Sequence, residues 1–311
     1  MEVQEVKSVA AIEGLKRNTI VYAEGALSIV NSSILFAGVG NILVVEAGAK
    51  IVDSRIAFKG DNSIVVIRKT RSDKINLRVD IFTDSFLLID SGLHATGTIT
   101  ISVAEHANLV IGKGCLFSRG CWVRNSDAHL IYDVETNKRL NLGRDMIIGD
   151  HVWVGQDVSI VKSPFVGSGA IIGMGSLVRS RVRSNAIYAG NPCSLQKEGV
   201  FWDKTPVQGF DAARTGRSTV FAGDRKLCVF DGEDVADNSA VWKREVSRIA
   251  KMKASPEKVE AILSLADQPP LVVKPPQPAP PKKKPLYKTV LGPVARRIPA
   301  PVLALLRPKR A

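Results

Sequence analysis

The stretch that decides the fold runs from residue 148 to residue 183 and reads IGDHVW, VGQDVS, IVKSPF, VGSGAI, IGMGSL, VRSRVR. Each of these six hexads opens on isoleucine or valine, glycine follows in four of them, and the fifth position is compact in all six. A period of six would rotate the leading residues around every face of an α-helix. It therefore predicts a coil of three short strands per 18 residues, with these stacked pairs of leaders: Ile148 on Val166, Val154 on Ile172, and Ile160 on Val178.

The same rule extends upstream of these hexads. Ile111, Phe117 and Val123 stand six apart, and Cys115 and Cys121 occupy the compact fifth positions between them. We therefore interpret these cysteines as corner packing and not as nucleophiles. Looser repeats of a turn followed by a branched apolar strand continue back to about residue 20. The sequence thus predicts an all-β fold, a parallel β-helix solenoid in which each coil bonds only to its neighbours.

The period breaks once, between residues 124 and 147, in a polar stretch after which the hexads resume at once. An excursion loop is the simplest interpretation, and loops held on rigid scaffolds often carry function.

Composition limits the classes of protein that the chain can represent. Its 311 residues are 45% apolar and carry a net charge of +13. Ten positive charges lie beyond Asp267, where no acidic residue occurs, so the first 267 residues carry only +3. The basicity belongs to a tail, and we predict no nucleic-acid partner. No apolar stretch is long enough for a membrane-spanning helix, and no apolar signal region opens the chain, which predicts a cytoplasmic protein. The four cysteines lack CxxC spacing, so no zinc site or disulfide framework is expected.

We expect four segments along the chain. Residues 1–19 form a lead-in, 20–203 the β-helix, 204–268 an extension, and 269–311 a flexible, proline-rich basic tail. Within the extension a short helix is predicted over 256–266, with Ser255 as its N-cap, whereas residues 205–250 show no period. In the tail, apolar residues alternate with basic ones. This pattern favours peripheral contact with the anionic inner face of a membrane, and a solvated linker is the alternative.

Three further motifs resemble those of a known protein family. Residues 126–133 read SDAHLIYD, residues 149–155 read GDHVWVG, and residues 189–192 read AGNP. Together with the hexads, they resemble the hexapeptide-repeat acyltransferases, whose fold is a left-handed parallel β-helix. The similarity is greatest to the branch of bacterial capsule, polysialic acid and exopolysaccharide O-acetyltransferases. It is close over residues 105–203 and loose over 20–104.

The resemblance implies transfer of acetyl from acetyl-CoA to a hydroxyl of a bacterial surface saccharide, with His129 as general base. An alcohol is a poor nucleophile at neutral pH, and an imidazole with a pKa of about 6.5 can take its proton as the new bond forms. Either Asp127 or Asp133 would orient the ring, and each could equally cap a turn of the loop.

The resemblance also implies a homotrimer, with acetyl-CoA bound along the groove between two solenoids. Trp153 would line the donor or acceptor site, and His151 would have a structural or interfacial role. The phosphate partner stays open, because the last coil reads RSRVRSN where the family more often has T-K-D-I-P. The candidate contacts of acetyl-CoA are Trp153, Gly155, Lys162, Ala170, Gly173, Arg179, Arg181, Asn191 and Pro192.

Three alternatives remain at this stage. The acceptor could be a nucleotide-linked amino sugar or serine, since the same base would serve. The solenoid could also be a non-catalytic scaffold. A carbonic anhydrase on the same solenoid needs three histidines around zinc, and none of the four histidines forms the required close pair, so no metal is expected.

Overall fold

The structure is a computed structural model that describes residues 3–23, 27–49, 51–71, 75–232 and 235–275. Its contacts divide the chain into one compact unit, Met1–Lys274, and a second unit, Pro275–Ala311, which falls almost entirely outside the described residues. The membrane contact predicted for the basic tail therefore lies largely outside the described residues.

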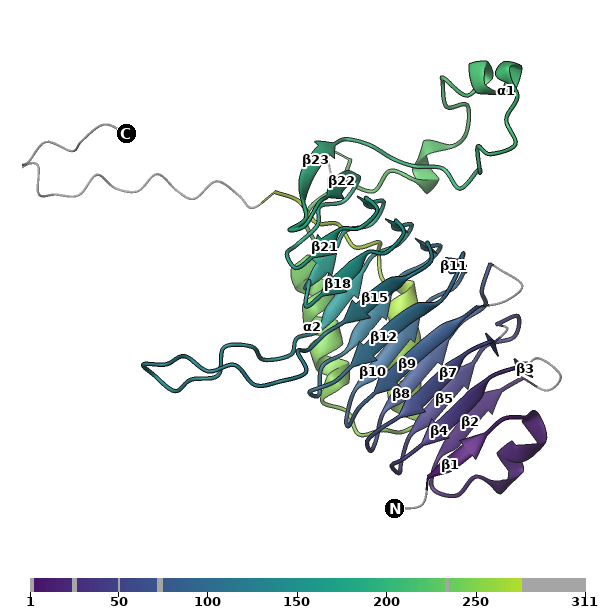
Figure 1. Cartoon of the computed structure of the whole chain (residues 1–311), viewed down its shortest axis with the longest axis vertical. Helices are drawn as coiled ribbons and strands as arrows, with labels where there is room; N and C mark the ends of the chain where they lie inside the picture. The colour runs from purple at the N-terminus through teal and green to yellow at the C-terminus, as the bar shows by residue number, and fades with distance from the viewer. Residues whose placement is uncertain (1–2, 24–26, 50, 72–74, 233–234, 276–311) are drawn as a thin grey trace, which may run out of the picture. The chain divides into compact units, whose positions relative to one another are not determined.

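Short strands wind around three faces of the first unit and stack into three sheets (Figure 1). Sheet 1 consists of β1 (Gln4–Val6), β4 (Ser33–Phe36), β7 (Arg55–Phe58), β9 (Leu77–Ile81), β12 (Ile99–Val103), β15 (Cys121–Arg124), β18 (Ser159–Val161) and β21 (Leu177–Val178). Sheet 2 consists of β2 (Thr19–Tyr22), β5 (Ile42–Val45), β8 (Ile64–Ile67), β10 (Phe86–Ile89), β13 (Leu109–Ile111), β16 (Met146–Ile148) and β19 (Phe165–Val166).

Sheet 3 consists of β11 (His94–Ala95), β14 (Leu116–Phe117), β17 (Trp153–Val154), β20 (Ile171–Ile172), β22 (Ala186–Ala189) and β23 (Ser194–Glu198). The earliest coils add a separate pair, β3 (Ile29–Val30) with β6 (Ile51–Val52). Neighbouring strands run parallel except at the two ends, where β1 pairs antiparallel with β4 and β23 with β22.

The register of these strands confirms the predicted coil. The three predicted pairs of leaders are strand partners in three different sheets. Across the excursion loop, Ile111 pairs with Ile148, Phe117 with Val154, and Val123 with Ile160. The loop therefore inserts at one corner without disturbing the stacking on either side. The prediction of a parallel β-solenoid is confirmed.

The N-terminal coils are longer than the hexad coils. Ile42 pairs with Ile64, and Ile64 pairs with Phe86, a repeat of 22 residues in place of 18. Buried polar side chains hold their corners, because Asn41 accepts from the amide of Ser63 and Asn108 from the amide of Phe86. A buried peptide group needs such a partner, which explains why asparagine and serine recur before these strands.

The interior of the solenoid is filled by the inward-facing residues, and the cysteines lie at its corners. Cys115 and Cys121 are fully buried, and their thiols contact the carbonyl oxygens of Gly149 and Gly155. Burial raises the pKa of Cys115 to about 12 and that of Cys121 to about 11. Neither thiol is a nucleophile at neutral pH, in agreement with corner packing.

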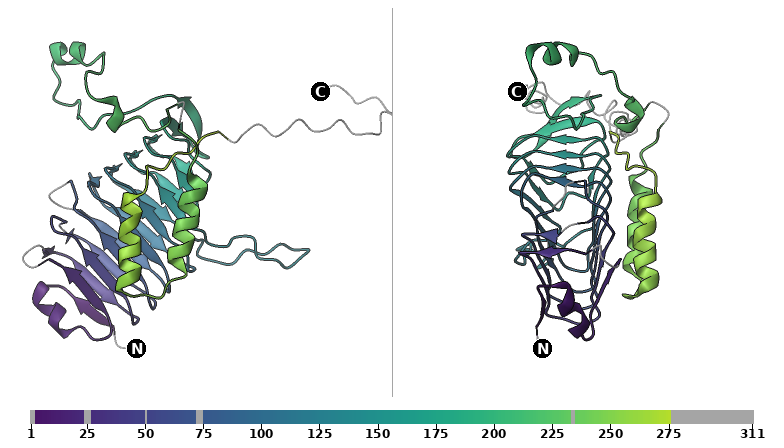
Figure 2. Two further views of the ribbon diagram at one scale, coloured as in Figure 1. Left: turned by 180° about the vertical axis from the view of Figure 1, so that it is seen from behind. Right: turned by 90° about the vertical axis from the view of Figure 1, so that its right-hand side faces the viewer.

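Two helices cover the outer face of sheet 2 (Figure 2). They are α2 (Ser239–Ala250) and α3 (Pro256–Leu263), and α3 continues as a 3₁₀ turn, η3 (Ser264–Asp267). Trp242 and Val246 of α2 are buried against outward-facing residues of sheet 2 such as Phe86. Ser255 caps α3 by accepting from the amide of Lys258. The remaining short helices are η1 (Val9–Gly14), α1 (Ala212–Arg217) and η2 (Arg225–Leu227).

The chain beyond α3 differs from the sequence expectation, which begins a flexible tail at residue 269. Residues 271–273 are buried, the Leu271 carbonyl accepts from the amide of Ser168, and the Val273 carbonyl accepts from the amide of Ser184. This short apolar segment extends the helical cover to Lys274 and closes the edge of the solenoid. Within the described ranges, no helix combines the length and apolar content that crossing a bilayer requires.

Candidate functional site

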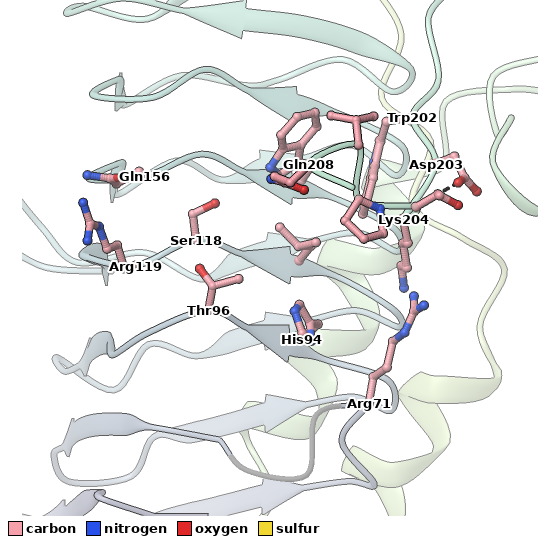
Figure 3. Close-up of a pocket in the computed structure, with 15 residues that line it drawn as sticks. Arg71, His94, Thr96, Ser118, Arg119, Gln156, Trp202, Asp203, Lys204 and Gln208 are labelled. Carbon is pink, nitrogen blue, oxygen red and sulfur yellow. Dashed lines mark hydrogen bonds between the residues drawn. The ribbon is translucent and has the colours of Figure 1, made fainter. Parts of the chain in front are cut away.

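A pocket of about 750 Å³ opens on the outer face of sheet 3 (Figure 3). Its floor is made by successive coils, with His94 on β11, Leu116 on β14 and Trp153 on β17. These three residues are strand partners, so they form one ladder across the sheet. Residues 202–208, which follow the last coil, return over this ladder and form the opposite wall. The volume is typical of a site for a small organic ligand.

Aromatic rings form one side of the pocket. Trp153 remains 41% exposed, and its ring lies 5.8 Å from the ring of the buried Trp202. Trp202 in turn stacks on His151 at 4.1 Å. Its indole N–H donates to the His151 carbonyl, and His151 Nε2 donates to the Trp202 carbonyl at 2.9 Å. Burial is the main cause that lowers the pKa of His151, so this ring is neutral and holds the return segment in place.

Positive charge gathers at one end of the pocket. Arg71, from the turn after β8, and Lys204, from the return segment, point toward each other beside His94 in Figure 3. Burial lowers the pKa of His94, and the charges of Arg71 and Lys204 lower it further. The pKa of Lys204 is lowered by burial first and then by Arg71.

The excursion loop carries His129 away from this pocket. His129 is exposed near the start of the loop, which projects from the side of the solenoid in Figure 1, and it is not one of the residues that line the pocket. The base of the loop is closed by Asp127, whose Oδ2 accepts from Lys162 Nζ at 2.8 Å and from Asn141 Nδ2 at 3.1 Å. Asn141 Nδ2 also donates to the carbonyl oxygen of His129 at 2.7 Å.

The two candidate aspartates therefore have different roles in the loop. The hydrogen bond from Lys162 is the main cause of a lowered pKa at Asp127, whose carboxylate contacts the side chains of Lys162 and Asn141. Asp133 caps a turn, because its Oδ1 accepts from the amide and the hydroxyl of Thr136 at 2.8 Å each. These hydrogen bonds lower the pKa of Asp133.

Of the predicted contacts of acetyl-CoA, Trp153 lines the pocket and the others lie elsewhere. Lys162 is held at the loop base, and Arg181 pairs with Asp237 at 3.0 Å beside the helical cover. Gly155 and Gly173 lie against the next coil, where an added Cβ would come within 3 Å of its neighbours. Ala170 is a buried corner, and the three remaining candidates, Arg179, Asn191 and Pro192, are exposed near the last coils.

Four residues that line or adjoin the pocket were not identified from the sequence, namely Arg71, His94, Trp202 and Lys204. His94 belongs to the 22-residue coils, where the hexad rule does not apply, so its alignment with Trp153 was hidden. Trp202 and Lys204 follow the last coil and reach the pocket only because the chain turns back. In the portion of the chain that the structure covers, no cluster of three or more His, Cys, Asp or Glu side chains could hold a metal ion.

Comparison with known proteins identifies the family of the chain. No family model matches the chain. The polysialic acid O-acetyltransferase of Escherichia coli O1:K1 is 35% identical over 103 residues, or 33% of this chain and 34% of the relative. The enzyme of the same name from Neisseria meningitidis is 46% identical over 66 residues, or 21% and 31%. The chain thus spans about a third of the length of these curated relatives.

Two crystal structures extend the similarity to about two thirds of the chain. The polySia-specific acetyltransferase NeuO is 32% identical, with a TM-score of 0.57 over 65% of this chain and 93% of that structure. The polysialic acid O-acetyltransferase OatWY is 27% identical, with a TM-score of 0.52 over 63% and 92%. By this similarity in sequence and fold, the chain belongs to the hexapeptide-repeat acyltransferases with a left-handed β-helix, in the branch of the polysialic acid O-acetyltransferases.

Proposed function

We propose that this chain transfers an acetyl group from acetyl-CoA to a hydroxyl of a bacterial surface saccharide, with His129 as the general base. The observation that carries the proposal is the pocket on sheet 3, with the half-exposed Trp153 in its floor. An aromatic face offers an apolar platform to a sugar ring or to the pantetheine arm. Thr96, Ser118 and Gln156 add polar groups along the same floor that can bind hydroxyls or amides.

We further propose that the working form is a homotrimer in which the loop of one copy completes the pocket of the next. His129 is exposed on a projecting loop, and the pocket of its own chain does not include it. A repeated head-to-tail contact that closes after three copies would bring three loops to three pockets. Each pocket would then receive one imidazole.

In this assembly the chemistry needs few groups. His129 takes the proton of the acceptor hydroxyl while the oxygen attacks the thioester carbonyl, and then returns that proton to the departing CoA sulfur. Backbone N–H groups near the base would stabilise the oxyanion. Asn141 acts through the loop backbone, because it donates to the carbonyl of His129, and Asp127 holds the side chain of Asn141 in place. Trp153 orients the substrates beside the base.

The use of acetyl-CoA as the donor also suggests where in the cell the enzyme works. Because acetyl-CoA is made in the cytoplasm, we propose that the enzyme works there, and that its basic tail contacts the inner face of the membrane.

Direct assay separates this function from its alternatives. The purified chain is incubated with acetyl-CoA and either saccharide oligomers, nucleotide-linked amino sugars or serine, and the released CoA thiol is measured. Transfer to a saccharide hydroxyl supports the proposal, and transfer only to an amine or to serine replaces it. A non-catalytic scaffold would release no thiol with any acceptor. NMR of surface polysaccharide from cells with and without the gene then identifies the acetylated position.

A further inference from the structure

We propose that an exposed arm, residues 209–227, packs on the excursion loop of a second copy where that loop enters the pocket. The inference rests on the assembly proposed above and gives a role to a segment in which the sequence shows no period. It makes Val220 and Leu227 of the arm the residues that hold a neighbouring loop, and with it His129, at the pocket.

Both ends of the arm are anchored beside the pocket. The arm continues from the return segment, which forms one wall of the pocket. The buried Asn185 fixes the far end, because its Nδ2 donates to the Cys228 carbonyl at 2.8 Å and its Oδ1 accepts from the Phe230 amide at 2.7 Å. The ring of Phe230 lies 6.3 Å from that of His151, which stacks on Trp202 of the pocket wall.

Between these ends the arm packs on little of its own chain. Every residue of the arm except Phe210 is exposed, and its short helix α1 buries no side chain. Within the ranges that the structure describes, the hydrogen bonds of the arm stay inside residues 207–229. Phe221 and Arg225 contact the ring of Phe201. The arm therefore has almost no apolar core to offset the conformational entropy that its ordering costs.

The arm also exposes large apolar side chains. Val220 is 76% exposed and Leu227 is 72% exposed, and Val207 of the adjoining return segment is exposed as well. Burial of such side chains against a partner removes apolar surface from water and stabilises the contact. An exposed apolar surface of this kind is typical of a site that binds another protein.

The excursion loop exposes a second apolar surface. Its residues 131–140 form a hairpin, in which the Leu140 amide donates to the Ile131 carbonyl at 2.9 Å. The hairpin and its root leave Leu130, Ile131, Leu140 and Leu142 each more than half exposed. In the part of the chain that the structure describes, none of these four side chains belongs to a buried cluster. The loop therefore presents an apolar surface that its own solenoid does not cover.

The partner of the arm is a second copy and not the loop of its own chain. The loop leaves the solenoid between β15 of sheet 1 and β16 of sheet 2, whereas the arm begins at the pocket on sheet 3. In the proposed trimer, the loop that reaches a pocket comes from the neighbouring copy. Because the arm begins at the wall of the same pocket, the incoming loop meets it there. Both apolar surfaces are then buried in one contact, which is repeated around the ring.

Cysteine cross-linking tests the contact without catalysis. Chains with Val220→Cys and chains with Leu140→Cys are given different affinity tags, co-expressed, purified over both resins and treated with a short bismaleimide. Cys193 is replaced by serine in both chains, because it is the native cysteine that is not buried. We expect a band on a denaturing gel that carries both tags. Since each chain holds only one of the two introduced thiols, that band joins separate copies.

The matched control is Val30→Cys in place of Val220→Cys. Val30 is an exposed valine on β3, in the earliest coils and outside both the arm and the pocket. This pair should give no band with both tags. Absence of the band with Val220→Cys, or an equally strong band with the control, would overturn the inference.

Dilution of the assembly measures how much the contact stabilises it. Leu227→Ser and Leu140→Ser should each raise the concentration at which half of the chains are assembled on the order of tenfold, as sedimentation velocity would show. The double variant should assemble no more weakly than the weaker single variant, because both substitutions remove the same contact. Fully additive effects, or wild-type assembly in both single variants, would contradict a shared contact.

A lipid surface is the rival occupant, since the arm carries four basic side chains. Pelleting with vesicles of anionic phospholipid that is lost in Val220→Ser and Leu227→Ser, without a cross-link to Leu140→Cys, would assign the arm to a membrane and overturn the inference. The same experiments separate the contact from the proposed function. A doubly tagged band from a protein that releases no CoA thiol supports the contact and removes the proposed activity, whereas an active protein without that band keeps the activity and loses the contact.

Discussion

The excursion loop and the floor of the pocket on sheet 3 are stabilised in different ways. The floor stacks Leu116 and Trp153 in register on rigid coils, and the pocket above it is lined by His94 but not by His129. The loop carries the candidate base His129 in the open, and polar contacts at its root hold it, in particular those of Asn141 with Asp127 and His129. The difference teaches that the residues that stabilise the fold lie in the coils of the floor, whereas the proposed proton transfer would depend on a segment that contributes little to the core.

Removal of the candidate base should give the largest effect. We expect His129→Ala to lower kcat by about 10²- to 10⁴-fold, the usual loss for a general base. Because His129 is exposed, the melting temperature should stay unchanged. Stopped assays of CoA release, with circular dichroism during heating, measure both quantities. A variant with the wild-type rate would remove His129 from the mechanism.

A large cavity inside the solenoid should lower stability, which substitution of His129 leaves unchanged. Phe117 is fully buried inside the solenoid, and Phe117→Ala should cost about 3–5 kcal/mol of stability. Val134, which is 93% exposed in the loop, provides the control, and Val134→Ala should leave the urea unfolding midpoint unchanged. Comparable destabilisation by the two substitutions would mean that the loop belongs to the folded core.

Loosening of the loop base should have a smaller effect on catalysis. Asn141→Ala removes the contacts to Asp127 and to the His129 carbonyl, and we expect kcat to fall about 10- to 100-fold through misplacement of the base. Affinity for the acceptor, measured by tryptophan fluorescence, should not change. Lys138→Ala, at an exposed position in the same loop, is the control. A parallel loss of affinity would indicate a structural role for Asn141 beyond positioning.

The smallest effect is expected for chemical modification of the two cysteines at the corners of the solenoid. Since burial raises the pKa of Cys115 to about 12 and that of Cys121 to about 11, both thiols stay protonated at pH 8. Iodoacetamide should therefore leave them unmodified in the folded chain and modify them in urea, as peptide mass spectrometry would show. Rapid modification of either cysteine in the native protein would contradict corner packing.

The repeat could be predicted from the sequence because its cause is local. A branched residue every six positions fills the prism, and this signal alone predicts the partners of Ile148 and Val154. The 22-residue coils obscured it, since their corners depend on buried hydrogen bonds of residues such as Asn41. Helix α2 was missed although its buried residues Trp242, Val246 and Ile249 follow a helical spacing. The buried residues 271–273 are too few to show a period and are fixed by packing on sheet 2.

The site was only partly predictable, because local sequence patterns identify some of its residues and not those that meet through the fold. Trp153 and His129 stand in motifs that resemble a family, so the sequence identifies them. Lys204 and Arg71 meet through a chain reversal after the last coil, which no local pattern records. Lys162 was a candidate contact of acetyl-CoA, and its spacing from Asp127 did not indicate that the two side chains pair at 2.8 Å.

The central claim is that the loop of one copy completes the pocket of another, and subunit mixing tests it most directly. Chains with His129→Ala and chains with Trp153→Ala are given different affinity tags, assembled together, and purified over both resins. Every mixed trimer then contains one pocket in which an intact Trp153 meets an intact His129 from its neighbour, so activity should return to about one third of wild type. Mixed assemblies no more active than either parent would contradict a site shared between copies.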